Sequence, residues 1–197
     1  MSPSMAEAYV LLGGICLQRN DLDGCLKYNQ MAVKAKPGFS EGWGNIGFVL
    51  LQKGDVAGAI NALEKATVFN FRFIQAFATL ANAYLMNGQI KKSIEANLKA
   101  LKISPEFAVA HNNLAIAYLE KNELALAAEH VGKAEALGYE VAAEIKAALS
   151  QNPSEPQVRA VELFAGLVHE GTKGRIRVQI YPNNQLGNQR DVVEGLQ

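Results

Sequence analysis

A period of 34 residues constrains this chain more than any other feature of its sequence. A large aromatic or imidazole side chain recurs at that spacing in four places, at Tyr9, Trp43, Phe77 and His111. A second column, at the same spacing, always holds alanine, at Ala32, Ala66, Ala100 and Ala134. Self-similarity at this period predicts stacked supersecondary units, each too small to bury its own faces, rather than one globular core.

Each 34-residue unit is predicted to be a hairpin of two helices. The first half of a unit carries apolar residues at helical spacing, as at Tyr9, Leu12 and Cys16. Midway through each unit stands a residue that tolerates the left-handed backbone of a helix C-terminus, namely Asn20, Gly54, Gly88 or Asn122. A small residue also recurs where two helices must approach closely, as at Cys25, Ala59, Ser93 and Ala127. Stacked hairpins of this kind bury one continuous core.

This pattern resembles the tetratricopeptide (TPR) repeat, with its aromatic-x-x-Leu-Gly opening, small middle residue and closing Pro. The opening is seen at Tyr9-x-x-Leu12-Gly13 and the closing Pro at Pro37 and Pro105. The resemblance implies an all-α superhelix of helix hairpins with a concave groove. The repeats are expected at 6–39, 40–73, 74–107 and 108–141, with a capping helix over 139–150.

The start of the first repeat has two interpretations. Pro3 precedes Tyr9 by six residues, as Pro37 precedes Trp43, so that Pro3 could close an upstream repeat. Alternatively, Ser2 caps the first helix and Pro3 takes its first helical position.

The repeat phase is lost after a cluster of helix-breaking residues at 151–156, which we take as a linker. An amphipathic helix is expected over 157–170, a strand over 175–181 and the start of another helix over 191–196. The string Tyr-Pro-x-x-Gln-Leu-Gly-x-x-Arg at 181–190 resembles the N-terminal region of TRAP-transporter solute-binding proteins of the dicarboxylate type. The resemblance covers 157–197, so that this short α/β segment is expected to be incomplete.

Members of that family close two α/β lobes on an organic acid held by a buried Arg much later in the chain. The family's first strand and that later Arg have no counterpart here, so the segment looks like part of a fusion or a truncation product. By the resemblance, Gln189 is a weak solute-binding candidate.

Composition excludes several function classes. Lys and Arg number 19, as do Asp and Glu, and neither part of the chain is basic, which argues against nucleic acid and anionic membranes as partners. No apolar run is long enough for membrane insertion. No nucleophile–base set or phosphate loop is present, so we expect neither an enzyme nor a cofactor.

The histidines and cysteines are given structural roles. His111 takes the aromatic position of the fourth repeat and has no partner at metal-ligand spacing. His130, beside Glu129, is expected at the surface. Cys16 and Cys25 fall at core positions and are expected as buried thiols, although a disulfide between them is geometrically conceivable. Gly13, Gly14, Gly42, Gly44 and Gly47 are interpreted as packing residues.

The groove is the expected site of function. In the TPR fold the first helix of each hairpin lines the concave face, and a 3.6-residue period selects its inward positions. The predicted peptide-binding residues are Val10, Gln18, Glu41, Asn45, Phe48, Gln52, Gln75, Asn82, Met86, Asn112, Asn113 and Ile116. Glu7 and Glu120 also fall at inward positions. Asn45 and Asn113 match a position where some long TPR superhelices use Asn to hold a peptide backbone.

The sequence thus predicts a non-enzymatic scaffold that binds a partner peptide or amphipathic helix. The alternatives are a component of TRAP-type solute transport, with transporter subunits as partners, and a carrier of a small apolar ligand. The expected compartment is the cytoplasm, or the periplasm if the chain is an internal part of a longer protein.

Overall fold

The structure, a computed structural model, describes residues 3–150 of the 197-residue chain. The helices within that range are α1 (Pro3–Gln18), α2 (Leu22–Ala35), α3 (Ser40–Gln52), α4 (Val56–Phe69), α5 (Ile74–Met86), α6 (Ile90–Ile103), α7 (Ala108–Glu120), α8 (Leu124–Ala136) and α9 (Ala143–Ser150). The predicted all-α architecture of helix hairpins is confirmed, and no strand occurs between residues 3 and 150. The elements predicted over 157–170, 175–181 and 191–196 lie outside the described residues.

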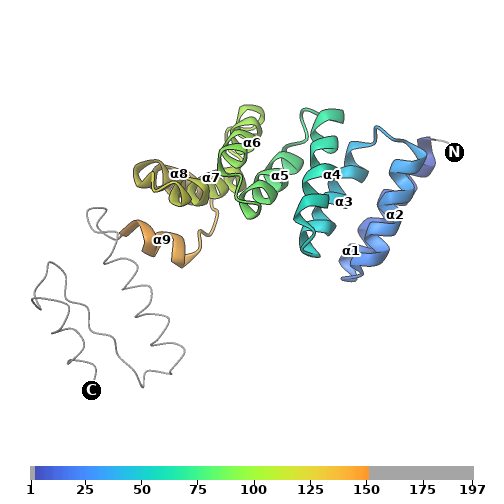
Figure 1. Cartoon of the computed structure of the whole chain (residues 1–197), viewed down its shortest axis with the longest axis horizontal. Helices are drawn as coiled ribbons and strands as arrows, with labels where there is room; N and C mark the ends of the chain where they lie inside the picture. The colour runs from blue at the N-terminus through green and yellow to red at the C-terminus, as the bar shows by residue number, and fades with distance from the viewer. Residues whose placement is uncertain (1–2, 151–197) are drawn as a thin grey trace, which may run out of the picture. The chain divides into compact units, whose positions relative to one another are not determined.

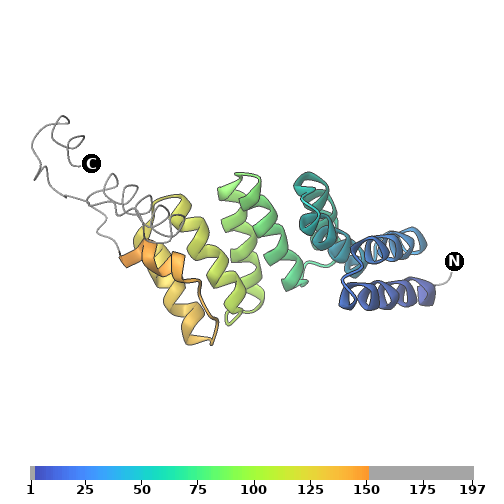
Figure 2. The same cartoon turned by 90° about the horizontal axis from the view of Figure 1, so that it is seen from below.

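The helices form four successive hairpins, α1–α2, α3–α4, α5–α6 and α7–α8 (Figure 1). Each hairpin rests on the next through its second helix, in the contacts of α2 with α3, α4 with α5 and α6 with α7. The first helices also contact one another in series, α1 with α3, α3 with α5 and α5 with α7. Because they contact one another in series, α1, α3, α5 and α7 form the inner row of the stack, and α2, α4, α6 and α8 form the outer row. Figure 2 shows the hairpins following one another along the stack, from blue to yellow.

The turn inside each hairpin is formed as the sequence predicts. Asn20 and Asn122 have positive φ angles of 58° and 59°, and Gly54 and Gly88 have 82° and 71°. The residue after each donates its N–H to a carbonyl five residues earlier, as from Asp21 to Cys16 at 2.8 Å. This bond closes the Schellman motif, which satisfies carbonyls at the end of a helix.

Small side chains allow the two helices of a hairpin to approach closely. All four members of the alanine column, Ala32, Ala66, Ala100 and Ala134, are fully buried. A methyl group placed on Gly47 would stand only 2.4 Å from Cγ of Leu63, which is itself fully buried. Helices α3 and α4 therefore have room for glycine and nothing larger at this crossing.

The two ends of the described repeats are formed by α1 and by α9, the helix that follows α8. Helix α1 is described from Pro3, the first residue that the structure describes, so the two interpretations of Pro3 both stay predictions. Helices α3, α5 and α7 begin at residues 40, 74 and 108, the first residues of three expected repeats. After α8, Val141 is buried and Lys146 of α9 forms an ion pair with Glu135 of α8.

Candidate functional site

The twelve predicted groove residues all belong to the inner helices α1, α3, α5 and α7, and we call their surface the inner face. The structure divides them by exposure. Seven are exposed to solvent: Gln18, Glu41, Phe48, Gln52, Gln75, Asn82 and Met86. Four are half-buried: Val10, Asn45, Asn113 and Ile116. Asn112 is buried, with only 8% of its surface exposed, so it does not contribute to the accessible surface.

Two of the exposed residues of the inner face are large and apolar, and we call this pair on neighbouring inner helices the apolar centre. Phe48 of α3 is 37% exposed and Met86 of α5 is 56% exposed, large values for apolar side chains on packed helices. Phe48, Asn82 and Ile116 occupy the same position in three successive repeats, so they form a row across α3, α5 and α7. A row of this kind offers contacts to a partner segment that crosses the inner helices.

The two asparagines predicted to hold a peptide backbone are engaged within the fold. The side-chain amide of Asn45 donates to Oδ1 of Asn29 at 3.0 Å, and that of Asn113 donates to the Ala78 carbonyl at 3.3 Å and to Oδ1 of Asn97 at 3.5 Å. Asn29 and Asn97 are fully buried on the outer helices α2 and α6. The pairs therefore join neighbouring hairpins.

These two asparagine pairs could have been found in the sequence. Asn29 precedes Asn45 by 16 residues, and Asn97 precedes Asn113 by the same number, whereas the repeat between them has Leu63 and Thr79 at these positions. An asparagine at one position is thus accompanied by an asparagine at the other. The hydroxyl of Thr79 bonds instead to the Gln75 carbonyl of its own helix at 2.8 Å.

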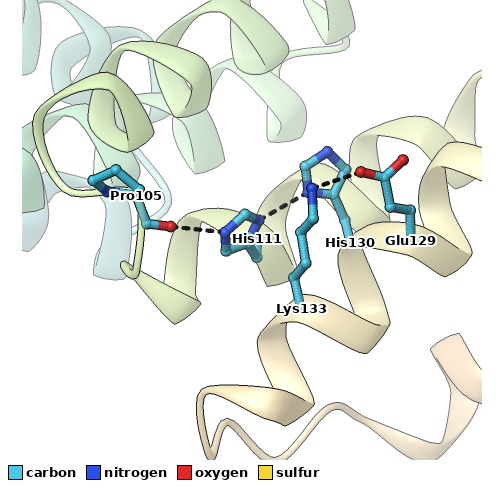
Figure 3. Close-up of polar contacts among 5 residues, drawn as sticks. All are labelled: Pro105, His111, Glu129, His130 and Lys133. Carbon is cyan, nitrogen blue, oxygen red and sulfur yellow. Dashed lines mark hydrogen bonds and ion pairs between the residues drawn. The ribbon is translucent and has the colours of Figure 1, made fainter.

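His111 and His130 form a buried polar cluster between α7 and α8 (Figure 3). The Nδ1 atoms of the two rings are 2.9 Å apart, and Nε2 of His111 lies 3.0 Å from the carbonyl oxygen of Pro105. Trp43, at the same repeat position as His111, donates its indole N–H to the Pro37 carbonyl at 2.7 Å. His111 therefore acts as the repeat's aromatic residue with a donor directed at the closing proline.

The same geometry assigns the protons of the pair. A neutral His111 that donates from Nε2 has a bare Nδ1, so His130 must donate from its own Nδ1. The expectation that His130 lies at the surface is wrong, because its ring stacks on Tyr118 and only 8% of the residue is exposed. Burial, followed by the nearby His111, lowers the pKa of His130 below its ordinary value of 6.5. Among residues 3–150 no group of three or more potential metal ligands is found.

Two other expectations about core residues need correction. Cys25 is buried, but Cys16 is only half-buried, and both thiols are free in the structure. Burial raises the pKa of both thiols, which disfavours the reactive thiolate. Gly14 is not a packing residue, because nothing lies within 4 Å of a methyl group placed on it, whereas such a group on Gly13 would meet the Asn29 amide at 2.3 Å.

Comparisons with known proteins agree with this architecture. Residues 40–67 match a family model described as tetratricopeptide repeat, and residues 81–122 match one described as TPR repeat. Residues 147–197 match the model of bacterial extracellular solute-binding proteins, family 7. No curated protein sequence matches the chain. No described helix is both long and apolar enough to cross a membrane.

Three solved structures illustrate the shared fold. MamA is 23% identical with a TM-score of 0.64, over 70% of this chain and 80% of MamA. A thermophilic TPR protein of Thermus thermophilus is 19% identical with a TM-score of 0.62, over 86% and 93% of the two chains. The first TPR of Spaghetti (RPAP3), bound to an HSP90 peptide, is 14% identical with a TM-score of 0.59, over 61% and 98%.

TPR proteins generally mediate protein–protein interaction, and their fold is typically non-enzymatic. The helix hairpins, the matched repeat models and the similar structures agree with one another. The chain therefore carries tetratricopeptide repeats, followed from residue 147 by a segment that matches family 7 bacterial extracellular solute-binding proteins.

Proposed function

We propose that the chain is a non-enzymatic scaffold that binds a segment of a partner protein on its inner face. The observation that carries this proposal is the exposure of Phe48 and Met86 on adjacent inner helices. Large apolar side chains exposed on neighbouring helices form a surface that a partner's apolar residues can cover. Gln52, Gln75 and Asn82 on the same two helices have exposed amides that can satisfy polar groups of the partner.

The inner face also argues against one use of TPR modules. Modules that clamp the acidic C-terminus of a chaperone place Lys and Arg in the groove, and the matching positions here hold Val10, Gly44, Ala78 and Asn112. A peptide ending in Glu-Glu-Val-Asp therefore finds no cation to pair with its carboxylates. We expect no binding of such a peptide by fluorescence anisotropy. Submicromolar affinity would refute this reading of the groove.

The proposal is tested by capture of partners from source lysate with the full chain and two inner-face variants. Phe48→Ser and Met86→Ser each remove an apolar side chain from the apolar centre without adding a charge. Leu126→Ser, on the outer helix α8, is the matched control because Leu126 has an exposure of 39%, similar to the 37% of Phe48. We expect the wild type and the control to retain a partner that both inner-face variants lose, with all four proteins equally helical by circular dichroism. A partner retained by both inner-face variants would refute the proposal.

A second candidate function rests on the match of residues 147–197 to solute-binding proteins. In that case the repeats dock a component of TRAP-type transport, and the captured partner is a transporter subunit. The same capture experiment separates the two functions by the identity of the partner, since a captured transporter subunit indicates the transport function whether or not the Phe48 variant releases it. Fractionation of source cells tests the proposed cytoplasmic location against the periplasm.

A further inference from the structure

Charge is distributed unequally between the inner and outer helices. The inner helices α1, α3, α5 and α7 contain no Lys or Arg, and their charged residues are Glu7, Glu41 and Glu120. The outer helices α2, α4, α6 and α8 contain eight Lys. The chain as a whole has formal charge zero, so the inner side is acidic within a neutral protein.

The three inner carboxylates are exposed and have no basic partner among the described residues. Lys53 and Lys121, which follow α3 and α7, pair instead with Asp23 and Glu123. Glu41 accepts one hydrogen bond, from the Ser40 hydroxyl at 2.9 Å. A cationic partner would therefore meet carboxylates that no lysine or arginine of the described part already neutralises.

The placement of these carboxylates matches that of the apolar centre. Glu41 and Phe48 lie seven residues apart on α3, which is two helical turns and about 10 Å along one side of the helix. Glu120 lies one turn beyond Ile116 on α7, so each of these two carboxylates lies within two turns of an apolar side chain on its own helix. An amphipathic ligand with both apolar and basic residues is complementary to this pattern.

The engaged asparagines indicate the conformation of that ligand. An extended peptide needs partners for its backbone N–H and C=O groups, and the amides of Asn45 and Asn113 already bond to Asn29, Asn97 and the Ala78 carbonyl. A helix satisfies its own backbone and requires only side-chain complementarity. Gln52, Gln75 and Asn82 remain exposed, but they do not share one repeat position as Asn45 and Asn113 do, so the inner face suits a helical ligand better than an extended one.

We propose that the partner segment on the inner face is a basic amphipathic helix, recognised by its apolar side and by Lys or Arg that reach Glu7, Glu41 and Glu120. This inference rests on the proposed function of the inner face and adds the conformation and charge of the ligand.

The test uses three synthetic peptides of about 18 residues, long enough to form a helix across several inner helices. The first is an amphipathic helix of Leu and Lys, the second has Glu in place of every Lys, and the third has the composition of the first with two central Pro that prevent a helix. Fluorescence anisotropy with the full chain gives Kd for each. We expect micromolar binding of the Lys helix, at least tenfold weaker binding of the other two, and weakening of the first between about 50 and about 300 mM salt.

Variants identify the groups responsible. The triple variant Glu7→Gln, Glu41→Gln, Glu120→Gln keeps the size of the side chains and removes their charge. The control triple Glu95→Gln, Glu106→Gln, Glu140→Gln removes three exposed carboxylates from an outer helix and two loops. Since an exposed ion pair contributes about a factor of two in affinity, the inner triple should weaken the Lys helix about five- to tenfold and the control triple less than twofold.

The outcomes distinguish this inference from the proposed function. Equal affinity for the Lys and Glu helices, or equal loss in the two triple variants, overturns the charge assignment, while sensitivity to Phe48→Ser still supports the inner face as a binding surface. Equal affinity for the Pro-containing peptide overturns the helical conformation. Absence of binding by the Lys helix at about 100 µM overturns the inference as a whole, and the lysate capture then decides the proposed function by itself.

Discussion

Two glycines on inner helices predict opposite effects of the same substitution. Gly14 lies in α1 and Gly47 in α3, and alanine in a helix interior is more favourable than glycine by about 1 kcal/mol. A methyl group on Gly14 meets nothing within 4 Å. The free energy of unfolding should therefore rise by about 0.5 to 1 kcal/mol in Gly14→Ala.

At Gly47 the same methyl group would lie 2.4 Å from Cγ of Leu63 and 3.1 Å from the backbone oxygen of Ala59. Leu63 is fully buried and the backbone oxygen belongs to α4, so neither can move without disturbing the crossing of α3 and α4. Overpacking of this kind costs about 1 to 3 kcal/mol. After the gain of about 1 kcal/mol in helix propensity is subtracted, Gly47→Ala should lower the free energy of unfolding by up to about 2 kcal/mol, whereas Gly14→Ala should raise it.

Urea denaturation followed by circular dichroism at about 222 nm measures both changes, with the m-value as the check that the unfolding transition is unaltered. Leu63→Ala provides the control for cause, because the double variant with Gly47→Ala should be more stable than the sum of the single effects predicts, by about 1 kcal/mol or more. If Gly47→Ala stabilises the protein as much as Gly14→Ala does, or if its effect simply adds to that of Leu63→Ala, close packing between these residues is not what requires glycine.

Three further perturbations test other parts of the repeat stack. Asn45→Ala leaves Oδ1 of buried Asn29 without its donor and should cost about 1 to 3 kcal/mol in urea denaturation, whereas a neutral result would contradict the hydrogen bond. Because the folded-state pKa of His130 is lowered from 6.5, stability should be fully present above that ordinary value and lost as pH falls through the lower pKa; His130→Phe should flatten this part of the pH profile measured by thermal unfolding. Gly54 has a φ angle of 82°, so Gly54→Ala should lower the free energy of unfolding by about 1 kcal/mol, whereas Gly14→Ala should not lower it.

The sequence predicts the fold closely because its strongest signals are local and repeated. The aromatic column, the alanine column and the turn residues each occur four times in register, and the structure buries Ala66 and turns at Gly54 as this periodicity requires. Hairpin geometry depends on contacts between nearby residues, so one unit predicts the next. The capping helix is the exception, because it has no second copy in the chain. It is expected over 139–150, whereas α9 begins at Ala143.

The candidate site was harder to predict because inward direction does not determine exposure. Asn112 is directed inward by helical periodicity, yet it is buried, and its Oδ1 has no partner among the described residues. Asn45 is directed inward too, but its hydrogen-bond partner is Asn29 of the preceding repeat, which helical periodicity within one repeat does not predict. Likewise, the neighbouring Glu129 leads to the expectation that His130 lies at the surface, whereas the ring of His130 stacks on Tyr118 in the structure. Such contacts follow from packing between units, which a single period does not specify.

Burial explains why the inner helices contain few charged residues, but it does not explain why those residues are all negative. Inner helices pack against an outer helix and against one another, so they should lose charged residues of both signs to the same extent. Long polar side chains nevertheless remain at their exposed positions, as at Gln18, Gln52 and Gln75, which shows that space and solvent are available there for a lysine as well. The charged residues that do remain are all glutamates. The absence of cations on the inner helices is thus a property of the exposed surface rather than of the core, and a basic partner is the ligand chemistry to which that surface is complementary.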